Sequence, residues 1–228
     1  MSASACACNE RERSRLLVVY REEREDRTVE KLRLFWAITI PAAIREELAE
    51  IQAVFRRLQL DVKWVETENF HVTVRFLGSV DTSLIEPLMA EVSERVSGTA
   101  QFKLGFGGIG VFPSVKKPRV LWVGLRGHEP VAVLHRQVEE AVVSLGLPRE
   151  EKAFSPHVTI GRFRAAANCA TLERKIAEVD ARHVGEFTVT GLDLLASRLT
   201  RHGPVYSMLR RIAFSGGGSG EEQKGAGI

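Results

Sequence analysis

The sequence predicts an α+β domain built from two small β-sheets, each with helices on its outer face. Segments with the two-residue period of strands alternate along the chain with segments of helical period. The order of these segments repeats imperfectly in the two halves of the chain, and one short histidine-containing strand sequence occurs in equivalent places of both. A duplicated set of strands and helices is most economically packed as two layered units that share one core.

The first half predicts three strands and two helices. Apolar residues run continuously or alternate in the strand segments, whereas in the helical segments they recur every three or four positions. Proline opens the first helix, where it is tolerated because the first turn needs no backbone donor from it. The strands are expected at 32–40, 61–66 and 71–78, and the helices at 41–58 and 84–96.

The second half predicts two strands, a helix, a strand, a helix and two final strands. The first of these strands contains four glycines, which indicate bulges or a close backbone approach. Gly146 ends the first helix of this half. The strands are expected at 101–112, 118–125, 157–163, 186–197 and 205–214, and the helices at 131–145 and 172–179.

The folded body is therefore expected to span residues 32–214. Residues 1–31 alternate in charge sign without an apolar face, which predicts a disordered extension. Residues 215–228 are rich in glycine and polar side chains and predict a flexible tail.

Composition favours a soluble cytoplasmic protein. The net charge of +3 tolerates a polyanionic partner without requiring one. The 3 cysteines form no disulfide framework, which suits a reducing compartment. No apolar run approaches the ~20 residues of a membrane span, and the N-terminus lacks a signal peptide, so no membrane association is expected.

Two strand segments carry the same polar pattern, "FHVTVRFLG" at 70–78 and "FSPHVTIGR" at 154–162. Successive side chains in a strand point to opposite faces, so His71 shares a face with Thr73 and His157 shares a face with Thr159. The aliphatic residues between them are left to pack against helices. Two such strands facing each other would place two imidazoles and two hydroxyls in one cleft.

This set of groups suits acid/base chemistry at phosphorus. A pair of histidines can divide the work, because one can act as a neutral base and the other as a protonated acid near neutral pH. Hydroxyl groups donate hydrogen bonds to phosphoryl oxygens. In-line displacement needs a proton removed on one side and delivered on the other. Such a site needs neither a metal ion nor a cofactor, and none is expected.

Two simpler interpretations compete with this one. A single strand histidine is usually just a half-exposed sheet residue, although two copies in equivalent places are much less expected by chance. A zinc site requires three or four ligands, and neither motif has a cysteine or carboxylate beside it in the sequence.

The paired motif resembles the signature of the 2H phosphoesterase superfamily, and within it the RNA 2′,3′-cyclic phosphodiesterases, also called 2′-5′ RNA ligases. The resemblance covers Leu32 to Phe214 and includes "RLFWAI", "HVTVRFLG", "GVFPSVKKPRVLWVGL", "FSPHVTIGR" and "GPVYSMLRRI". It implies a bilobal fold of two antiparallel sheets with outer helices, related by pseudo-two-fold symmetry, with the active-site cleft between them. The extension before Lys31 departs from the family pattern.

The resemblance also implies an activity, a partner and residue roles. The expected reaction is metal-independent opening of a terminal 2′,3′-cyclic phosphate on RNA to a 2′-phosphomonoester, with 2′-5′ ligation as its reverse. Separately from the resemblance, we expect a monomer. His71 would donate a proton to the leaving 3′ oxygen, and His157 would activate water. Thr73 and Thr159 would hold the non-bridging oxygens. Two alternatives stay open: a sibling phosphoesterase for small cyclic phosphates or 2′-5′ oligonucleotides, and a non-catalytic module that binds RNA ends.

Arginines and aromatic residues near the motifs have two possible placements each. Strict alternation puts Arg162 on the face opposite His157, whereas a break at Gly161 would turn it inward as a substrate-binding residue. Arg75 is expected either at the cleft mouth or, slightly favoured, exposed on the strand. Phe112 and Trp122 would either stack on a terminal base or, as we favour here, belong to the core.

Overall fold

A computed structural model describes residues 30–165, 169–179, 181, 184–201 and 203–216. Most of the predicted extension at 1–31 and of the predicted tail at 215–228 lies outside the described residues. The chain divides at residue 31, and the fold described below is that of the part beginning at Leu32. Within the described residues, no helix is long and apolar enough to cross a membrane.

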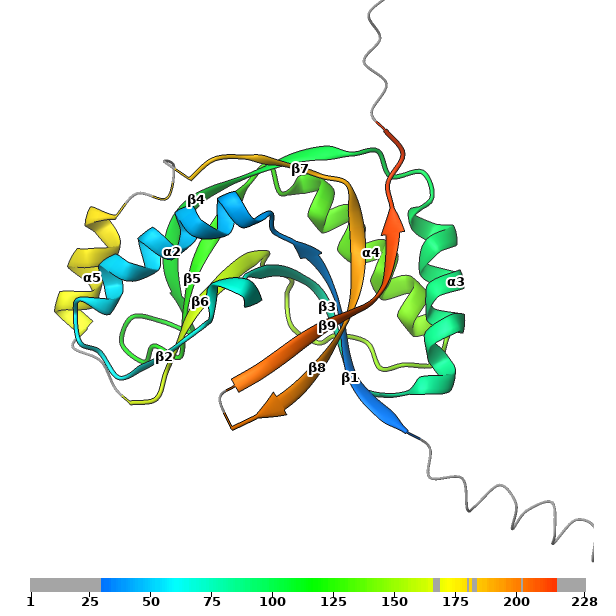
Figure 1. Ribbon diagram of the computed structural model, residues 1–228, viewed down its shortest axis with the longest axis horizontal. Coiled ribbons are helices and arrows are strands. Elements are labelled where there is room, and N and C mark those ends of the chain that lie inside the picture. Colours follow the sequence, from blue (N-terminus) through cyan, green and yellow to red (C-terminus); the bar gives the residue numbers. More distant parts are fainter. Residues whose placement is uncertain (1–29, 166–168, 180, 182–183, 202, 217–228) are drawn as a thin grey trace, which may run out of the picture. The chain divides into compact units, whose positions relative to one another are not determined.

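Every predicted strand and helix is present, in the predicted order (Figure 1). The bounds are β1 (Lys31–Thr39), α2 (Ala42–Arg56), β2 (Val62–Trp64), η1 (Thr67–Asn69), β3 (His71–Asp81), η2 (Thr82–Leu84), α3 (Ile85–Val96), β4 (Phe102–Phe112), β5 (Val120–Arg126), α4 (Glu129–Ser144), β6 (His157–Phe163), α5 (Cys169–Glu178), β7 (Phe187–Val189), β8 (Gly191–Thr200) and β9 (Gly203–Ala213).

One predicted strand, 186–197, is divided in the structure. Its first part, β7, pairs with β4, whereas the rest, β8, pairs with β1 and β9. The chain moves from one group of strands to another at Thr190, whose carbonyl accepts a hydrogen bond from the backbone of Phe214. The sequence reads as one strand because both parts are rich in β-forming residues, although they belong to different neighbours.

The strands form one curled path in the order β7-β4-β5-β6-β3-β1-β8-β9, with β2 also paired to β6. The two predicted sheets are the two sides of this path, joined where β3 meets β6 at the registered pair Val72 and Val158. We call the side with β3, β1, β8 and β9 the β3 lobe, and the side with β6, β5, β4, β7 and β2 the β6 lobe.

The lobes are not the two halves of the chain. Helices α3 and α4 pack on one another, with α4 against β3 and α3 against β9, so both cover the β3 lobe. Helix α2 follows β1 in the chain but packs against β6. The main core lies beneath the motif strands, because Val72, Val74, Val158 and Ile160 are almost fully buried in it.

A buried ion pair joins the motif strand β3 to helix α4. Arg75 is only 6% exposed and pairs with Glu139, which is also buried. The same guanidinium donates to the carbonyl oxygen of Pro148 at 2.6 Å, and Glu139 accepts the backbone N–H of Glu150 at 2.8 Å. Both expected placements of Arg75, exposed on the strand or at the cleft mouth, are therefore wrong, because its Nε donates to Glu139 of α4 and its Nη2 to the loop that leads from α4 to β6.

We expect Arg75→Met to destabilise the protein strongly, because it leaves the buried Glu139 carboxylate without its charged partner. Losing one member of a buried pair typically lowers the free energy of unfolding by about 3–5 kcal/mol. Urea denaturation followed by circular dichroism measures this loss.

The double variant Arg75→Met with Glu139→Leu should recover part of that stability, because both buried charges are then gone. Lys103→Met, which breaks the exposed pair with Glu186, serves as the control and should leave the urea midpoint unchanged. A single Arg75→Met variant as stable as the control would contradict the assigned role.

Candidate active site

The pairing of β3 with β6 places all four motif residues on one surface. Val72 lies opposite Val158 in an antiparallel register, and both side chains point into the core. By alternation, the histidines and threonines on either side of these valines point to the other face. The same register places His71 beside Thr159, and Thr73 beside His157. The two motifs therefore meet edge to edge as neighbouring strands.

Both imidazoles are held by the same kind of backbone contact. Nδ1 of His71 lies 2.7 Å from the carbonyl oxygen of Asn69, and Nδ1 of His157 lies 2.7 Å from that of Ser155. A carbonyl only accepts, so each Nδ1 must carry the hydrogen. In the neutral rings Nε2 is then the free base, and it is the atom available for proton exchange.

The hydroxyl of Thr73 contacts the histidine of its own motif. Oγ1 of Thr73 lies 3.1 Å from Nε2 of His71, so the hydroxyl donates to the neutral imidazole. Thr73 and Thr159 are both half-buried on the motif face. Both hydroxyls therefore belong to the surface that carries the proton-exchanging nitrogens.

Aromatic rings surround both histidines. His71 lies between Phe35 and Tyr206, with ring centroids 5.0 and 5.1 Å away. His157 contacts Phe112 edge to face, with centroids 5.1 Å apart, and lies 6.2 Å from Trp122. Burial among these groups lowers the pKa of His71 to about 4 and also lowers the pKa of His157.

The aromatic wall behind His157 corrects an expectation from the sequence. Phe112 and Trp122 are half-buried and contact the histidine, so they line the site instead of filling the core. A Cβ atom on Gly110 would lie 2.2 Å from the Trp122 ring, so this glycine makes room for the indole. The close approach predicted from the glycines of β4 is thus confirmed at this position.

Arg162 reaches the motif face through a bulge in β6. Leu121 of β5 pairs with Gly161, but Trp122 pairs with Thr159, which leaves Ile160 as an extra residue. The extra residue reverses the alternation, so Arg162 returns to the face that carries Thr159. The positive charge of Arg162 accordingly contributes to the lowered pKa of both His71 and His157. The bulge and these electrostatic effects favour the inward one of the two placements that the sequence allows.

The bulge depends on glycine at position 161. A Cβ atom there would lie 2.7 Å from Cγ1 of Val62, in the neighbouring strand β2. The carbonyl of the extra residue, Ile160, is held by the buried amide of Gln52 at 2.8 Å. Helix α2 and strand β2 therefore fix the backbone that turns Arg162 toward the histidines.

The site thus offers two proton-exchanging nitrogens, two hydroxyls and one guanidinium. Within the described part of the chain, no group of three or more histidine, cysteine, aspartate or glutamate side chains is arranged to hold a metal ion. A set of this kind can remove one proton, deliver another and neutralise an oxyanion between them.

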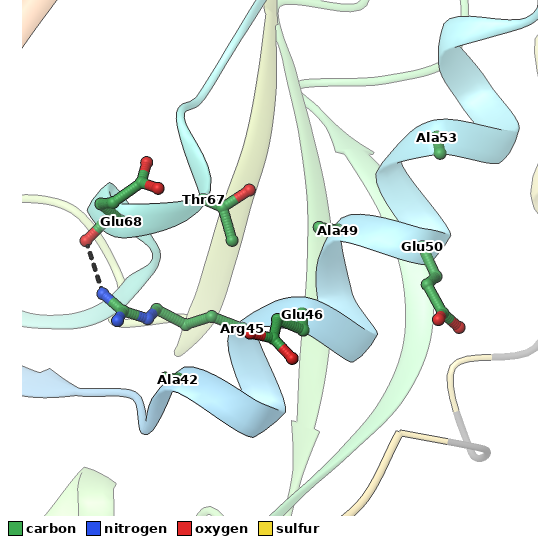
Figure 2. A pocket seen from close by; sticks show the side chains of 8 residues that line it. All are labelled: Ala42, Arg45, Glu46, Ala49, Glu50, Ala53, Thr67 and Glu68. Atoms are coloured by element: carbon green, nitrogen blue, oxygen red, sulfur yellow. Dashed lines mark hydrogen bonds between the residues drawn. The ribbon is translucent and has the colours of Figure 1, made fainter.

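A hollow of about 490 Å³ lies between α2 and η1. In Figure 2 the side chain of Arg45 extends from α2 toward η1, where it donates to the carbonyl oxygen of Glu68. No motif residue lines it. Its lining consists of Ala42, Arg45, Glu46, Ala49, Glu50, Ala53, Thr67 and Glu68.

Comparison with known proteins agrees with the geometry. The family model described as the 2'-5' RNA ligase superfamily matches residues 40–201. A protein of Aeropyrum pernix named RNA 2',3'-cyclic phosphodiesterase is 34% identical, over 75% of this chain and 97% of its own. The protein of the same name from Archaeoglobus fulgidus is 36% identical, over 78% of this chain and 98% of its own.

Solved structures share the fold. The crystal structure of TT0787 of Thermus thermophilus matches with a TM-score of 0.70 and 27% identity, over 80% of this chain and 97% of that one. E. coli LigT complexed with 3'-AMP matches with a TM-score of 0.68 and 24% identity, over 82% and 99% of the two chains. Together with the family match, these likenesses confirm the predicted bilobal fold. The chain belongs to the 2′-5′ RNA ligase superfamily, the 2H phosphoesterase group that its paired histidine motifs predict.

Proposed function

We propose that this protein is an RNA 2′,3′-cyclic phosphodiesterase, which hydrolyses a terminal 2′,3′-cyclic phosphate to a 2′-phosphomonoester. The observation that carries the proposal is the pair of imidazoles on one face, each with its Nδ1 bound to a backbone carbonyl. This arrangement leaves two Nε2 atoms for the two proton transfers of the reaction. The names of the relatives supply the substrate class.

The reaction proceeds by in-line displacement. Nε2 of His157 takes a proton from water, and the water oxygen bonds to phosphorus. The bond from phosphorus to the 3′ oxygen breaks, and Nε2–H of His71 delivers a proton to that oxygen. The 2′ oxygen keeps its bond to phosphorus, which gives the 2′-phosphomonoester. The division of roles between the two histidines follows the family pattern.

The charge that develops on the phosphoryl oxygens requires donors. Thr73 and Thr159 supply hydroxyl hydrogen bonds, and Arg162 supplies a planar cation that suits phosphate geometry. The reverse reaction, 2′-5′ ligation, would use the same two histidines in exchanged roles, because the transition state is shared. The presence of all four motif side chains argues against a module that only binds RNA ends.

The decisive experiment uses an oligoribonucleotide that ends in a 2′,3′-cyclic phosphate. We expect a product with a 2′-phosphate, identified by phosphorus NMR, at the same rate with and without EDTA. His71→Ala and His157→Ala should each lower kcat by about 10²–10⁴-fold, the usual contribution of general acid/base catalysis.

His128→Ala is the matched control, because His128 is exposed and lies at the start of α4, outside both motifs. It should leave kcat unchanged. A 3′-phosphate product, an inactive wild-type protein or full activity in either motif variant would contradict the proposed reaction.

The pH dependence follows from the two lowered pKa values. Catalysis needs His71 protonated and His157 neutral, but in the free protein the pKa of His71 is about 4 and that of His157 lies below the ordinary 6.5. Above both values, the protonated fraction of His71 falls about tenfold per pH unit. We expect kcat/KM, which reports the free enzyme, to peak below pH 6.5 and to fall on the alkaline side.

Bound substrate should move this optimum. The phosphate anion favours the imidazolium form of His71, so kcat should peak at a higher pH than kcat/KM. Steady-state rates measured from about pH 4 to about pH 9, with circular dichroism as a check on folding, test both statements. A kcat/KM that stays flat between about pH 5 and about pH 8 would exclude the assigned pair.

Arg162→Met should act on both binding and proton transfer. Losing one donor to a developing oxyanion typically lowers kcat by about 10²–10³-fold. Removing the positive charge should also raise the pKa of His71 and His157, because the charge of Arg162 contributes to lowering both. NMR titration of the imidazole signals measures this shift without any substrate.

Arg162→Lys retains the positive charge but loses the planar guanidinium group. It should therefore keep the low histidine pKa values, with a kcat between those of Arg162→Met and the wild type. Arg164→Met, at an exposed position two residues further on, is the control and should change neither quantity. Unchanged pKa values in Arg162→Met would place this side chain away from the imidazoles.

A further inference from the structure

An apolar row crosses the cleft-facing surface of the β3 lobe. Phe35 of β1 pairs in register with Leu195 of β8, which pairs in register with Met208 of β9. On the other side of Phe35, the ring of Phe76 from β3 lies 5.7 Å away. Paired residues of neighbouring strands share a face, so Phe35, Leu195 and Met208 form a row, and the ring contact with Phe35 adds Phe76 at its end.

This row lies on the motif face of the sheet and not in the main core. Phe35 also contacts the ring of His71, at 5.0 Å, which places the row beside the candidate acid. Phe35 and Leu195 belong to a small apolar cluster separate from the main core, with Tyr206 packed against it. The sheet therefore has a second apolar surface, directed toward the site.

The two ends of the row are exposed. Phe76 is 52% exposed and Met208 is 51% exposed, whereas Phe35 and Leu195 between them are almost fully buried. Stability of the fold does not require a phenylalanine and a methionine to face solvent at the two ends of a row that contacts His71 through Phe35. Exposed apolar surface next to a polar site is typical of a surface that binds a ligand.

The chemistry of the substrate shows which part of it lies here. This step rests on the proposed function. Both ester oxygens of a 2′,3′-cyclic phosphate belong to one ribose, and His71 protonates the 3′ oxygen as it leaves. The attacking water approaches from the opposite side, where His157 lies. The ribose, and the base attached to it, must therefore extend toward the side of the site on which His71 lies.

We propose that Phe76 and Met208, supported by the buried Phe35 and Leu195, form a platform for the base of the terminal nucleotide. Aromatic and thioether side chains pack against the flat face of any base. Such a surface tolerates every sequence at the RNA end while orienting the ribose so that its 3′ oxygen faces His71. Phe76 and Met208 are thus specificity residues for a nucleoside over a base-free cyclic phosphate.

The test compares two substrates that differ only in the base: adenosine 2′,3′-cyclic phosphate and the 2′,3′-cyclic phosphate of methyl riboside. We expect Phe76→Ala to lower kcat/KM for the nucleotide by about 5- to 150-fold, the range for one base stacked on an aromatic side chain. Met208→Ser should act in the same direction. Both variants should leave kcat/KM for the base-free substrate within about twofold of the wild type.

Val205→Ala is the matched control. Val205 is 48% exposed and lies on β9, but alternation with Tyr206 directs it to the opposite face of the strand. It should leave both substrates unaffected. Equal losses on the two substrates, or no loss on either, in Phe76→Ala and Met208→Ser would overturn the platform while leaving the proposed function intact.

Failure of the proposed function has a different signature. In that case the wild-type protein would hydrolyse neither substrate. The platform would then be tested by calorimetric binding of adenosine 2′-phosphate against methyl riboside 2′-phosphate. A wild-type preference for the adenosine compound that disappears in Phe76→Ala and Met208→Ser would support the platform, and its absence would overturn it.

Discussion

The pairing of Val72 with Val158 is the contact on which the candidate site depends. It joins the two lobes, and its register decides which side chains share a surface. A slip of one residue would move each histidine and threonine to the core face and bring the valines out. The aliphatic burial of both valines opposes such a slip, because each is fully buried in the main core. Packing of the core thus sets the geometry of the polar surface.

Residues of helix α4 help to position the segment that precedes the second motif. Nδ1 of His135 donates to the carbonyl oxygen of Val74 at 2.8 Å, and its ring stacks on Phe154 with centroids 4.0 Å apart. Phe154 precedes His157 by three residues. The Arg75–Glu139 pair holds an earlier part of the same loop. His135 of α4 therefore connects the strand of the first motif, through Val74, to the segment just before the second motif, through Phe154.

The sequence predicts the parts of this site that depend on a single strand. Alternation places His71 with Thr73, and His157 with Thr159, and duplication suggests that they meet. The inward turn of Arg162 could not be decided, because the bulge at Ile160 arises from contacts with β2, β5 and Gln52. Bulges of this kind depend on neighbouring strands and not on local propensity.

Other differences have the same origin. Arg75 is polar and occupies a strand, which favours an exposed position, but its buried partners come from a helix and a loop more than sixty residues away. The division between β7 and β8 reflects a change of pairing partner at Thr190, which no local pattern reveals. Phe112 and Trp122 are large apolar residues in apolar strands, which favours a place in the core. The glycines of β4 nevertheless leave room for the indole of Trp122 beside His157.

The symmetry of the two motifs does not extend to their surroundings, and this difference matters for the chemistry. Both imidazoles donate from Nδ1 to a backbone carbonyl oxygen, and this hydrogen bond favours the imidazolium form without outweighing burial. Burial and Arg162 instead disfavour the charged form, most strongly at His71, whose pKa falls to about 4. An acid of low pKa releases its proton readily to an alkoxide, but it must first be protonated. The anionic phosphate is the group that favours that proton, so a site of this design becomes competent only as the substrate binds.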